Sequence, residues 1–310
     1  MTETTKKIRT AINGVLLLNK PLGISSTQAL GRAKWLTGAL KAGHTGTLDP
    51  LADGLLPLCF GHATKLAHDL LDADKTYEAR VVLGRSTTTG DAEGEVIFSN
   101  DAVITREQWD AVVPLFTGDI SQTPPMYSAL KKDGKPLYEY ARAGIEIERE
   151  ARSVRILKLE TLSFDYPNVV MSVTCSKGTY IRTLAQDMGE TLGVGAHLSG
   201  LRRTAVGDLQ LSDALTLEQI EAIPEAERAA VLLPLDALLQ DAPALYLSRE
   251  LAARFVQGQR LPWGAQQFVS DATLRIYWQD DDLPAPLLLG LATQENGVIS
   301  PTKVLMTALP

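Results

Sequence analysis

Residues 14–19 read GVLLLN and residues 43–50 read GHTGTLDP, and these two stretches organise the first part of the chain. The first is a short apolar run that ends in the turn residues 20–23, which predicts a buried strand. Hydroxyl side chains at 25–27 offer N-cap oxygens, so a helix is expected over 28–36. The second stretch contains two glycines and a proline, and it predicts a loop.

Further elements follow outward from these two stretches. The patterns predict strands at 75–83, 155–164, 169–175 and 195–206 and helices at 62–72, 105–116, 135–143 and 180–192. Residues 84–94 predict a turn-rich loop, and the polar stretch 118–136 predicts a long surface excursion. Because strands and helices are mixed without a regular βαβ rhythm, we expect an α+β fold with a large mixed, mostly antiparallel sheet flanked by helices.

The last third of the chain has a weaker pattern. A Glu/Ala-rich helix and a turn at 234–236 are followed by a strand at 245–247, a helix at 249–257, and strands near 274–278 and 286–291. A chain of 310 residues is long for one compact core. We therefore expect a large domain over residues 1–240 and a small β-rich domain over residues 241–310.

Composition and charge bound the class of protein. The apolar fraction of 45% and charged fraction of 22% are ordinary for a folded soluble chain. No apolar run is long enough to span a bilayer, and residues 1–12 lack a signal-peptide core, so we expect a cytoplasmic protein without membrane association. Residues 1–48 carry seven Lys and Arg against one Glu, within a net charge of −7. This basic segment fits either an RNA-binding surface or a solvated tail.

Asp49 is the first candidate for chemistry. An aspartate before proline is commonly a turn former. In a loop rich in Gly and Thr, however, a carboxylate can be held exposed and rigid, as a nucleophile requires. Asp53 could pair with it as the two carboxylates of a glycosidase, but we favour a helix-start role for Asp53.

Metal and cofactor sites are not indicated. Cys59 and Cys175 form no CxxC pair, and the histidines do not follow the H-E-x-x-H spacing. The chain has no phosphate-binding P-loop and no dinucleotide fingerprint. We therefore expect no metal and no cofactor, with the chemistry performed by side chains.

Several other side chains have two interpretations each. Tyr77 lies on an alternating strand, where one aromatic usually packs in the core. Arg182 follows Tyr180 at a predicted helix start, where it could keep a nearby carboxylate ionised or form a surface ion pair of little energetic value. His44 could bind a phosphate or base edge, or hydrogen-bond within its own loop.

Five sequence blocks occur in an order and spacing that resemble the bacterial tRNA pseudouridine-55 synthase family, of the TruB type. The blocks are Lys20-Pro21-x-Gly23 with Ser25-Ser26, GHTGTLDP at 43–50, Lys75-Thr76-Tyr77, PPMYSALK at 124–131 and SKGTYIRTL at 176–184. The resemblance covers about residues 10–240, and the end of the chain is similar to the family's small PUA-like RNA-binding domain. It implies the pseudouridine synthase fold and isomerisation of uridine in the TΨC stem-loop of tRNA.

The resemblance also implies a mechanism. The target uridine flips out of the RNA loop, and Tyr77 provides its stacking platform and a candidate acceptor for a sugar proton. Asp49 attacks either C1′ of the ribose or C6 of the uracil. Arg182 pairs with Asp49 and holds it charged and aimed. The reaction consumes no cofactor or metal, and the enzyme is expected to act as a monomer without a protein partner.

The remaining site residues that the resemblance implies support these three. Tyr180 and Leu201 are expected to line the uracil pocket, and His44 to lie near the flipped nucleotide. Lys20 and Pro21 are expected to support the floor of the site. The excursion over 124–152 is expected to be a thumb that closes on the RNA hairpin, with the cations Lys131, Lys132, Lys135, Arg142, Arg149 and Arg152. The alternative is that this segment is a mobile solvated loop. Both can be true, with the segment disordered when free and ordered when it binds RNA.

Two other classes of function remain open at this stage. A nucleoside or glycoside hydrolase that uses Asp49 and Asp53 would release free base or sugar. A non-catalytic RNA-binding or RNA-folding protein would use the basic N-terminal segment and the C-terminal domain, and this role could coexist with the enzyme.

Overall fold

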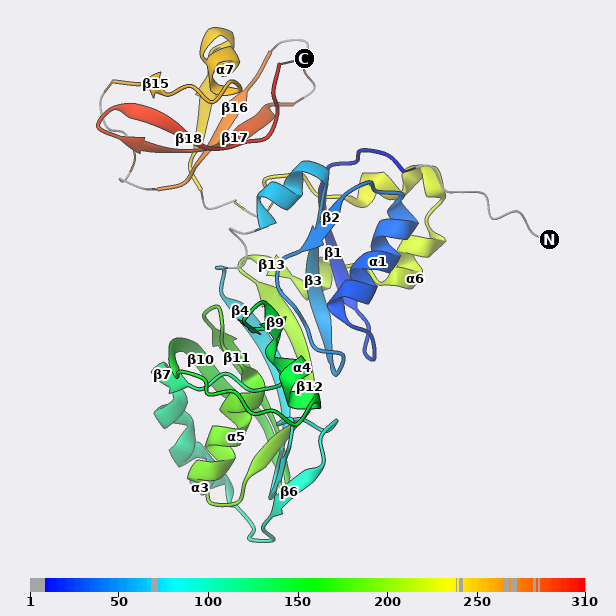
Figure 1. Ribbon diagram of the computed structural model, residues 1–310, viewed down its shortest axis with the longest axis vertical. Helices are drawn as coiled ribbons and strands as arrows, with labels where there is room; N and C mark the ends of the chain where they lie inside the picture. Colours follow the sequence, from blue (N-terminus) through cyan, green and yellow to red (C-terminus); the bar gives the residue numbers. More distant parts are fainter. Residues whose placement is uncertain are drawn as a thin grey trace, which may run out of the picture.

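The computed structural model describes residues 9–67, 72–237, 239, 242–264, 268, 272–280, 283 and 285–309. Its larger sheet has nine strands in the order β1-β3-β12-β4-β11-β10-β7, with β2 paired to β3 and β13 paired to β12 (Figure 1). These strands are β1 (Gly14–Lys20), β2 (Ala42–His44), β3 (Ala52–Phe60), β4 (Lys75–Leu83), β7 (Gly118–Gln122), β10 (Arg152–Asp165), β11 (Asn168–Cys175), β12 (Ala196–Val206) and β13 (Leu209–Gln210).

All neighbouring strands of this sheet run antiparallel except β3 and β12, which are parallel. The predicted mixed, mostly antiparallel sheet is therefore confirmed. The parallel pair joins the β1-β3 half of the sheet to the half built from β12, β4, β11, β10 and β7. Helices cover the two halves separately (Figure 1).

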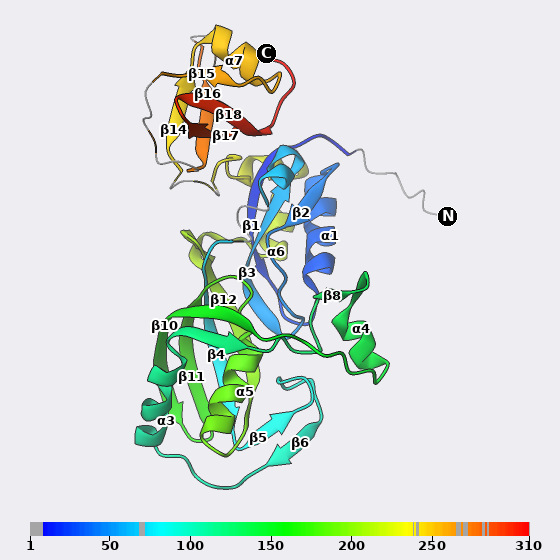
Figure 2. The same cartoon turned by 60° about the vertical axis from the view of Figure 1, so that its left-hand side comes forward.

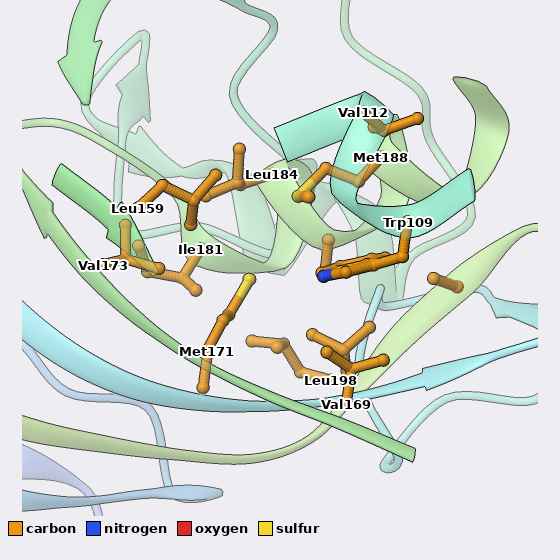
Figure 3. Close-up of a cluster of buried hydrophobic side chains, with 14 of the residues drawn as sticks. Trp109, Val112, Leu159, Val169, Met171, Val173, Ile181, Leu184, Met188 and Leu198 are labelled. Carbon is orange, nitrogen blue, oxygen red and sulfur yellow. The ribbon is translucent and has the colours of Figure 1, made fainter. Parts of the chain in front are cut away.

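One apolar core lies under helices α3 (Arg106–Val112) and α5 (Ile181–Thr191). Figure 3 shows Trp109 of α3 and Met188 of α5 facing Met171 of β11 and Leu198 of β12. These side chains are buried, and the indole Nε1 of Trp109 donates to Thr161 Oγ1 at 2.8 Å. Burial of this apolar surface is the main source of stability for this half of the domain. It also fixes the N-terminus of α5 against the sheet.

A second core lies where α1 (Ser26–Thr37) and α6 (Leu217–Ala222) pack on β1 and β3. The Ser25 side chain caps α1 through the backbone NH of Gln28, and the Gln28 side chain returns the bond, forming a capping box. Ser26 is buried, and its hydroxyl both accepts from the NH of Leu48 at 2.7 Å and donates to its carbonyl at 3.0 Å. The start of α1 thereby holds the loop that carries Asp49.

The C-terminal sheet has five strands in the order β14-β16-β17-β18-β15. They are β14 (Ala244–Leu247), β15 (Leu261–Pro262), β16 (Leu274–Trp278), β17 (Leu287–Glu295) and β18 (Val298–Val304), and α7 (Arg249–Phe255) packs against them. Leu66 joins an apolar cluster with this sheet, and Lys65 Nζ donates to the Val304 carbonyl at 2.9 Å. The C-terminal β-rich domain is therefore present, while the predicted boundary residues 240 and 241 lie outside the described residues.

The predicted excursion differs from the structure at both ends. Residues 118–122 form β7, the edge strand that pairs with β10, because their alternating side chains suit a sheet edge. Arg152 begins β10 and so belongs to the sheet. Between them the chain forms the hairpin β8 (Lys131–Lys132) and β9 (Lys135–Pro136) and then α4 (Leu137–Arg142), which projects away from the sheet in Figure 2.

Four other expectations need correction. Asp53 is not a helix start but part of β3, because the apolar run Ala52–Phe60 is buried as a strand. The predicted loop 84–94 includes β5 (Arg85–Thr87), which pairs with β6 (Val96–Ser99). Of the helix predicted at 62–72, Gly61–Lys65 forms a 3₁₀ helix, and 68–71 lie outside the described residues. The Glu/Ala-rich segment is also a 3₁₀ helix, Glu225–Val231.

No helix in the described part of the chain is both long enough and apolar enough to cross a bilayer.

Gly54 is where the two halves of the sheet meet, opposite Arg203 in the parallel pair. A Cβ there would lie 2.3 Å from the Arg203 carbonyl oxygen, and the backbone φ is +99°. Gly54→Ala is expected to lower the free energy of unfolding by about 3 kcal/mol or more, as measured by urea denaturation. Gly193→Ala, at a φ of +74° with no atom within 4 Å, is the control and should cost about 1–2 kcal/mol. Equal losses in the two variants would contradict this account of the junction.

Candidate active site

A cavity of about 600 Å³ opens where the two halves of the sheet meet. Five parts of the chain line it: the loop before β3, the strands β4 and β12, the start of α5, and the excursion. The lining residues are Gly46, Thr47, Leu48, Asp49, Lys75, Tyr77, Ser128, Ala129, Leu130, Ser176, Gly178, Thr179, Tyr180, Ile181, Arg182, Leu201 and Arg203. Four of the five sequence blocks supply lining residues. The blocks at 43–50, 75–77 and 176–184 supply Asp49 and its neighbours, and the block at 124–131 in the excursion supplies one wall.

Asp49 and Arg182 form an ion pair in this cavity. Arg182 Nη2 lies 3.0 Å from Asp49 Oδ2. The Asp49 side chain is 44% exposed, whereas that of Arg182 is 7% exposed. The carboxylate is therefore open to the cavity on one side and anchored on the other, and the ion pair that the family resemblance implies is present.

The guanidinium of Arg182 is itself fixed by three further groups. Its Nη1 donates to the Thr89 carbonyl at 2.9 Å and its Nη2 to the Tyr127 carbonyl at 2.7 Å. Its Nε lies 3.6 Å from the buried carboxylate of Asp91. A buried charge with this many partners is rigid, so Arg182 is not the weak surface ion pair that was the alternative interpretation.

Asp91 is a site residue that the sequence did not single out. Its carboxylate accepts from Thr89 Oγ1 at 2.5 Å and from the backbone NH of Glu93 at 3.1 Å. Removal of Arg182 would leave Asp91 as an uncompensated buried charge, which is costly. The turn-rich composition of residues 84–94 gave no signal of this burial, because Asp in a Gly-rich stretch usually forms a turn.

Tyr77 lies on β4 directly opposite Arg203 of β12. Its ring packs against both apolar cores and also lines the cavity, so both interpretations of this tyrosine hold. Burial raises the pKa of the Tyr77 phenol, and the nearby Arg203 only partly opposes this. The phenol is therefore protonated at neutral pH. It is available as a hydrogen-bond donor, which disfavours the role of proton acceptor that the resemblance implies.

Two cavity cations were missed by the sequence. Arg203 is buried and its Nε donates to the Leu55 carbonyl at 2.7 Å, which ties β12 to β3. Lys75 is buried at the start of β4, and burial lowers its pKa to about 8. Their positions follow from strand pairing, which no local pattern reveals.

Tyr180 and Leu201 both reach the cavity, as expected. Tyr180 precedes α5, and its backbone NH and carbonyl bond the side chain of Gln122 at 3.1 and 3.3 Å. The edge strand β7 therefore positions this tyrosine. Leu201 lies mid-strand on β12, between Ala79 of β4 and Ala52 of β3.

Lys20 and Pro21 support the site without lining the cavity. Lys20 Nζ donates to the carbonyls of Pro21 at 2.9 Å and Ile24 at 2.7 Å, and the lysine is fully buried. Gly23 NH donates to the Pro50 carbonyl at 2.9 Å, so this turn contacts the Asp49 loop. The structure thus places both residues behind the loop, as a floor.

His44 is not among the residues that line the cavity. It ends β2, opposite Leu58 of β3, and its buried Nδ1 has no hydrogen-bond partner among the described residues. Burial, with a smaller contribution from Arg203, lowers the pKa of His44, so its imidazole is neutral at neutral pH. Its proposed place near a flipped nucleotide stays a prediction.

Asp53 does not join Asp49. Its carboxylate is paired with Arg202 at 2.6 Å, and it is absent from the cavity lining, where Asp49 is the one carboxylate that the described residues supply. This arrangement disfavours the two-carboxylate hydrolase, which needs both groups to flank one sugar bond. The described residues also contain no group of three or more His, Cys, Asp or Glu placed to hold a metal ion.

Burial lowers the pKa of Lys20 from 10.5 to about 8, and Asp53 and Asp49 only partly offset this. The unfolded chain therefore binds the lysine proton more tightly than the folded protein. The free energy of unfolding should rise as the pH increases from 8 to 10.5, by at most about 3 kcal/mol from this group. Lys20→Met should remove the Lys20 part of this rise in urea unfolding series and leave the part from Lys75, whose pKa burial also lowers to about 8.

Lys41→Met is the matched control, because Lys41 is exposed and also lies in the basic N-terminal segment. It should leave the pH dependence of unfolding unchanged. Parallel stability curves for the wild type and Lys20→Met would contradict the burial account of Lys20.

Comparisons with known proteins identify the family of this chain. Residues 34–181 match the model "TruB family pseudouridylate synthase (N terminal domain)", and residues 182–240 match "tRNA pseudouridylate synthase B C-terminal domain". Residues 243–305 match "Pseudouridine synthase II TruB, C-terminal".

Two curated relatives, both named tRNA pseudouridine synthase B, show the extent of the likeness. The protein from Cupriavidus metallidurans is 56% identical over 303 residues, which is 96% of this chain and 95% of that one. The protein from Burkholderia lata is 55% identical and covers 97% and 92% of the two chains. A solved Cbf5-Nop10-Gar1 complex contains a chain of similar fold, with a TM-score of 0.71 and 25% identity over 94% of this chain and 85% of that one. The chain belongs to the TruB family of pseudouridylate synthases.

Proposed function

We propose that this protein converts the uridine at position 55 in the TΨC loop of tRNA to pseudouridine, with Asp49 as the nucleophile. The observation that carries the proposal is the Asp49–Arg182 ion pair, which holds a half-exposed carboxylate in the wall of a cavity of about 600 Å³. The name of the two relatives described above, tRNA pseudouridine synthase B, supports tRNA as the substrate.

The reaction needs the target uridine outside its RNA loop, because a stacked base cannot reach Asp49. Tyr77 and Leu201 offer apolar walls for the flipped uracil. The Asp49 carboxylate attacks C1′ or C6, and the N1–C1′ bond breaks. The base turns and C5 bonds to C1′. The bond that Asp49 formed to C1′ or C6 breaks and restores the carboxylate, C5 loses its proton and N1 gains one. The product is an isomer of the substrate, so no atom is gained or lost overall.

Arg182 contributes by position and charge. Its partners Thr89, Tyr127 and Asp91 fix the guanidinium before any RNA binds, so Asp49 needs no reorientation during the reaction. Such preorganised electrostatics is usually a large part of enzymatic rate enhancement. The protonated phenol of Tyr77 can donate a hydrogen bond to the sugar or base, whether Asp49 attacks C1′ or C6.

RNA binding is assigned to two further parts of the chain. The excursion between β7 and β10, residues 123–151, presents exposed cations on its hairpin and on α4, among them Lys131, Lys132 and Arg142. We propose that it closes on the stem-loop and that the C-terminal β-rich domain contacts the same RNA. We further propose that the enzyme acts in the cytoplasm as a monomer.

The proposed function is tested with an isolated TΨC stem-loop as substrate. The wild type should convert the target uridine to pseudouridine, detected by carbodiimide labelling and primer extension, with no change in RNA mass. A stem-loop with cytidine at the target should stay unlabelled. The mass matters because a hydrolase removes the base and lowers the mass of the RNA.

Two results would contradict the proposal. Release of free uracil would establish hydrolysis in place of isomerisation. Tight binding of the stem-loop with unmodified uridine would establish a non-catalytic RNA-binding protein. Labelling of a uridine elsewhere in the RNA would contradict the position but leave the isomerase activity intact.

A further inference from the structure

The linker between the large domain and the C-terminal domain is fixed on both sides. Leu233 pairs with Val15 of β1: its NH donates to the Val15 carbonyl at 2.8 Å, and its carbonyl accepts from the Val15 NH at 3.0 Å. Only a few residues later, Asp236 contacts the C-terminal domain. Linkers between domains are usually exposed and make few contacts, so that the domains move relative to each other. This linker differs, and the proposed reaction does not account for its contacts.

The Asp236 carboxylate binds two side chains of β16. It lies 3.3 Å from Arg275 Nη1, and it accepts a hydrogen bond from the Tyr277 hydroxyl. The side chains of Asp236 and Arg275 are 18% and 13% exposed, so solvent ions screen this pair less than an ion pair at the surface. Burial, with a contribution from Asp236, raises the pKa of Tyr277, so the phenol is protonated and donates.

Arg275 also binds the end of the linker that leads into β14. Its Nε donates to the Ala242 carbonyl at 2.8 Å, and its backbone NH donates to the Pro243 carbonyl at 2.8 Å. The guanidinium therefore contacts the linker at two points, the carboxylate of Asp236 and the carbonyl of Ala242. Removal of the carboxylate would release the first point, which is the one nearer the large domain in the sequence.

An apolar contact supports the same joint from the large domain. Leu66, which follows the 3₁₀ helix of that domain, is fully buried in a cluster with Leu288 and Leu291 of β17. Leu235 of the linker packs against this cluster and also against the cluster that contains Val15. Such contacts oppose domain motion, because opening the joint would expose their apolar surface to water.

We propose that Asp236 is a positioning residue that fixes the C-terminal domain in its RNA-binding orientation before tRNA binds. This inference rests on the proposed function, which takes tRNA as the RNA that both domains contact. Figures 1 and 2 show the C-terminal domain at one end of the molecule, beyond the large domain. When the orientation is preset, less conformational entropy is lost on binding. Asp236 does not line the cavity of Asp49, so its contribution is to affinity and not to the chemical step.

The first test measures the joint in the free protein by double electron–electron resonance. Spin labels are attached to Glu221→Cys on α6 and Glu250→Cys on α7, two exposed positions, and the two native cysteines are buried and do not compete for label. The distance distribution should be narrow when the joint is intact. Asp236→Ala should make it at least about twofold wider, because the contacts of the linker with β16 are lost.

The second test separates binding from chemistry with full-length tRNA. Asp236→Ala should weaken the Kd at least about fivefold, because the freed domain must be ordered on binding, and keep the single-turnover rate at saturating enzyme within about twofold of the wild type. Glu295→Ala is the matched control, since this carboxylate is exposed on the same C-terminal sheet, at the end of β17. It should keep both the wild-type Kd and the narrow distance distribution.

If Asp236→Ala does not fold by circular dichroism, Leu66→Ala gives the same two readouts, because it removes the apolar contact from the side of the large domain. An unchanged distance distribution in the folded variant would overturn the proposal, as would a broad distribution with Asp236 present. A broader distribution with an unchanged Kd would also overturn it, since the orientation would then not matter for binding. Failure of the wild type to form pseudouridine would contradict the proposed function alone, because the distance and Kd measurements need no turnover.

Discussion

The ion pair between Asp49 and Arg182 is the contact on which the rest of the site depends. Arg182 is buried, so its charge must be compensated by the protein, and Asp91 with two backbone carbonyls does this from one side. Asp49 completes the set from the cavity side. A flexible ion pair at the surface would contribute little to stability. This pair belongs to a network of groups from four segments of the chain, around residues 49, 89–91, 127 and 182.

The fold serves this contact by bringing distant segments to one junction. The parallel β3-β12 pair joins two half-sheets, each with its own apolar core, and the cavity opens where they meet. Ser26 at the start of α1 holds the Asp49 loop from one half, and the core under α5 holds Arg182 from the other. The close approach at Gly54 keeps the halves in register.

Local patterns predicted those parts of the molecule that depend on neighbouring residues. The strands β1 and β4 and the helices α1 and α5 followed from periodicity and capping. The placement of Asp49, Tyr77 and Arg182 in one cavity was implied by the resemblance to the TruB family. Asp53 was predicted at a helix start. It lies in β3 instead, because the apolar run Ala52–Phe60 is buried as a strand. Asp91, Lys75 and Arg203 were missed, since their roles depend on pairing between strands and loops far apart in the sequence. His44 was expected near the nucleotide but does not line the cavity of the RNA-free protein.

The central claim is that Asp49, held by Arg182, performs the covalent step. The most direct measurement is single-turnover pseudouridine formation by Asp49→Asn, beside its affinity for the same TΨC stem-loop. Asparagine keeps the shape and a hydrogen bond to Arg182 but cannot act as the nucleophile. The account predicts that pseudouridine formation becomes undetectable while the Kd changes by less than about tenfold, since we propose that the excursion and the C-terminal domain also bind the RNA. Turnover at the wild-type rate would contradict it.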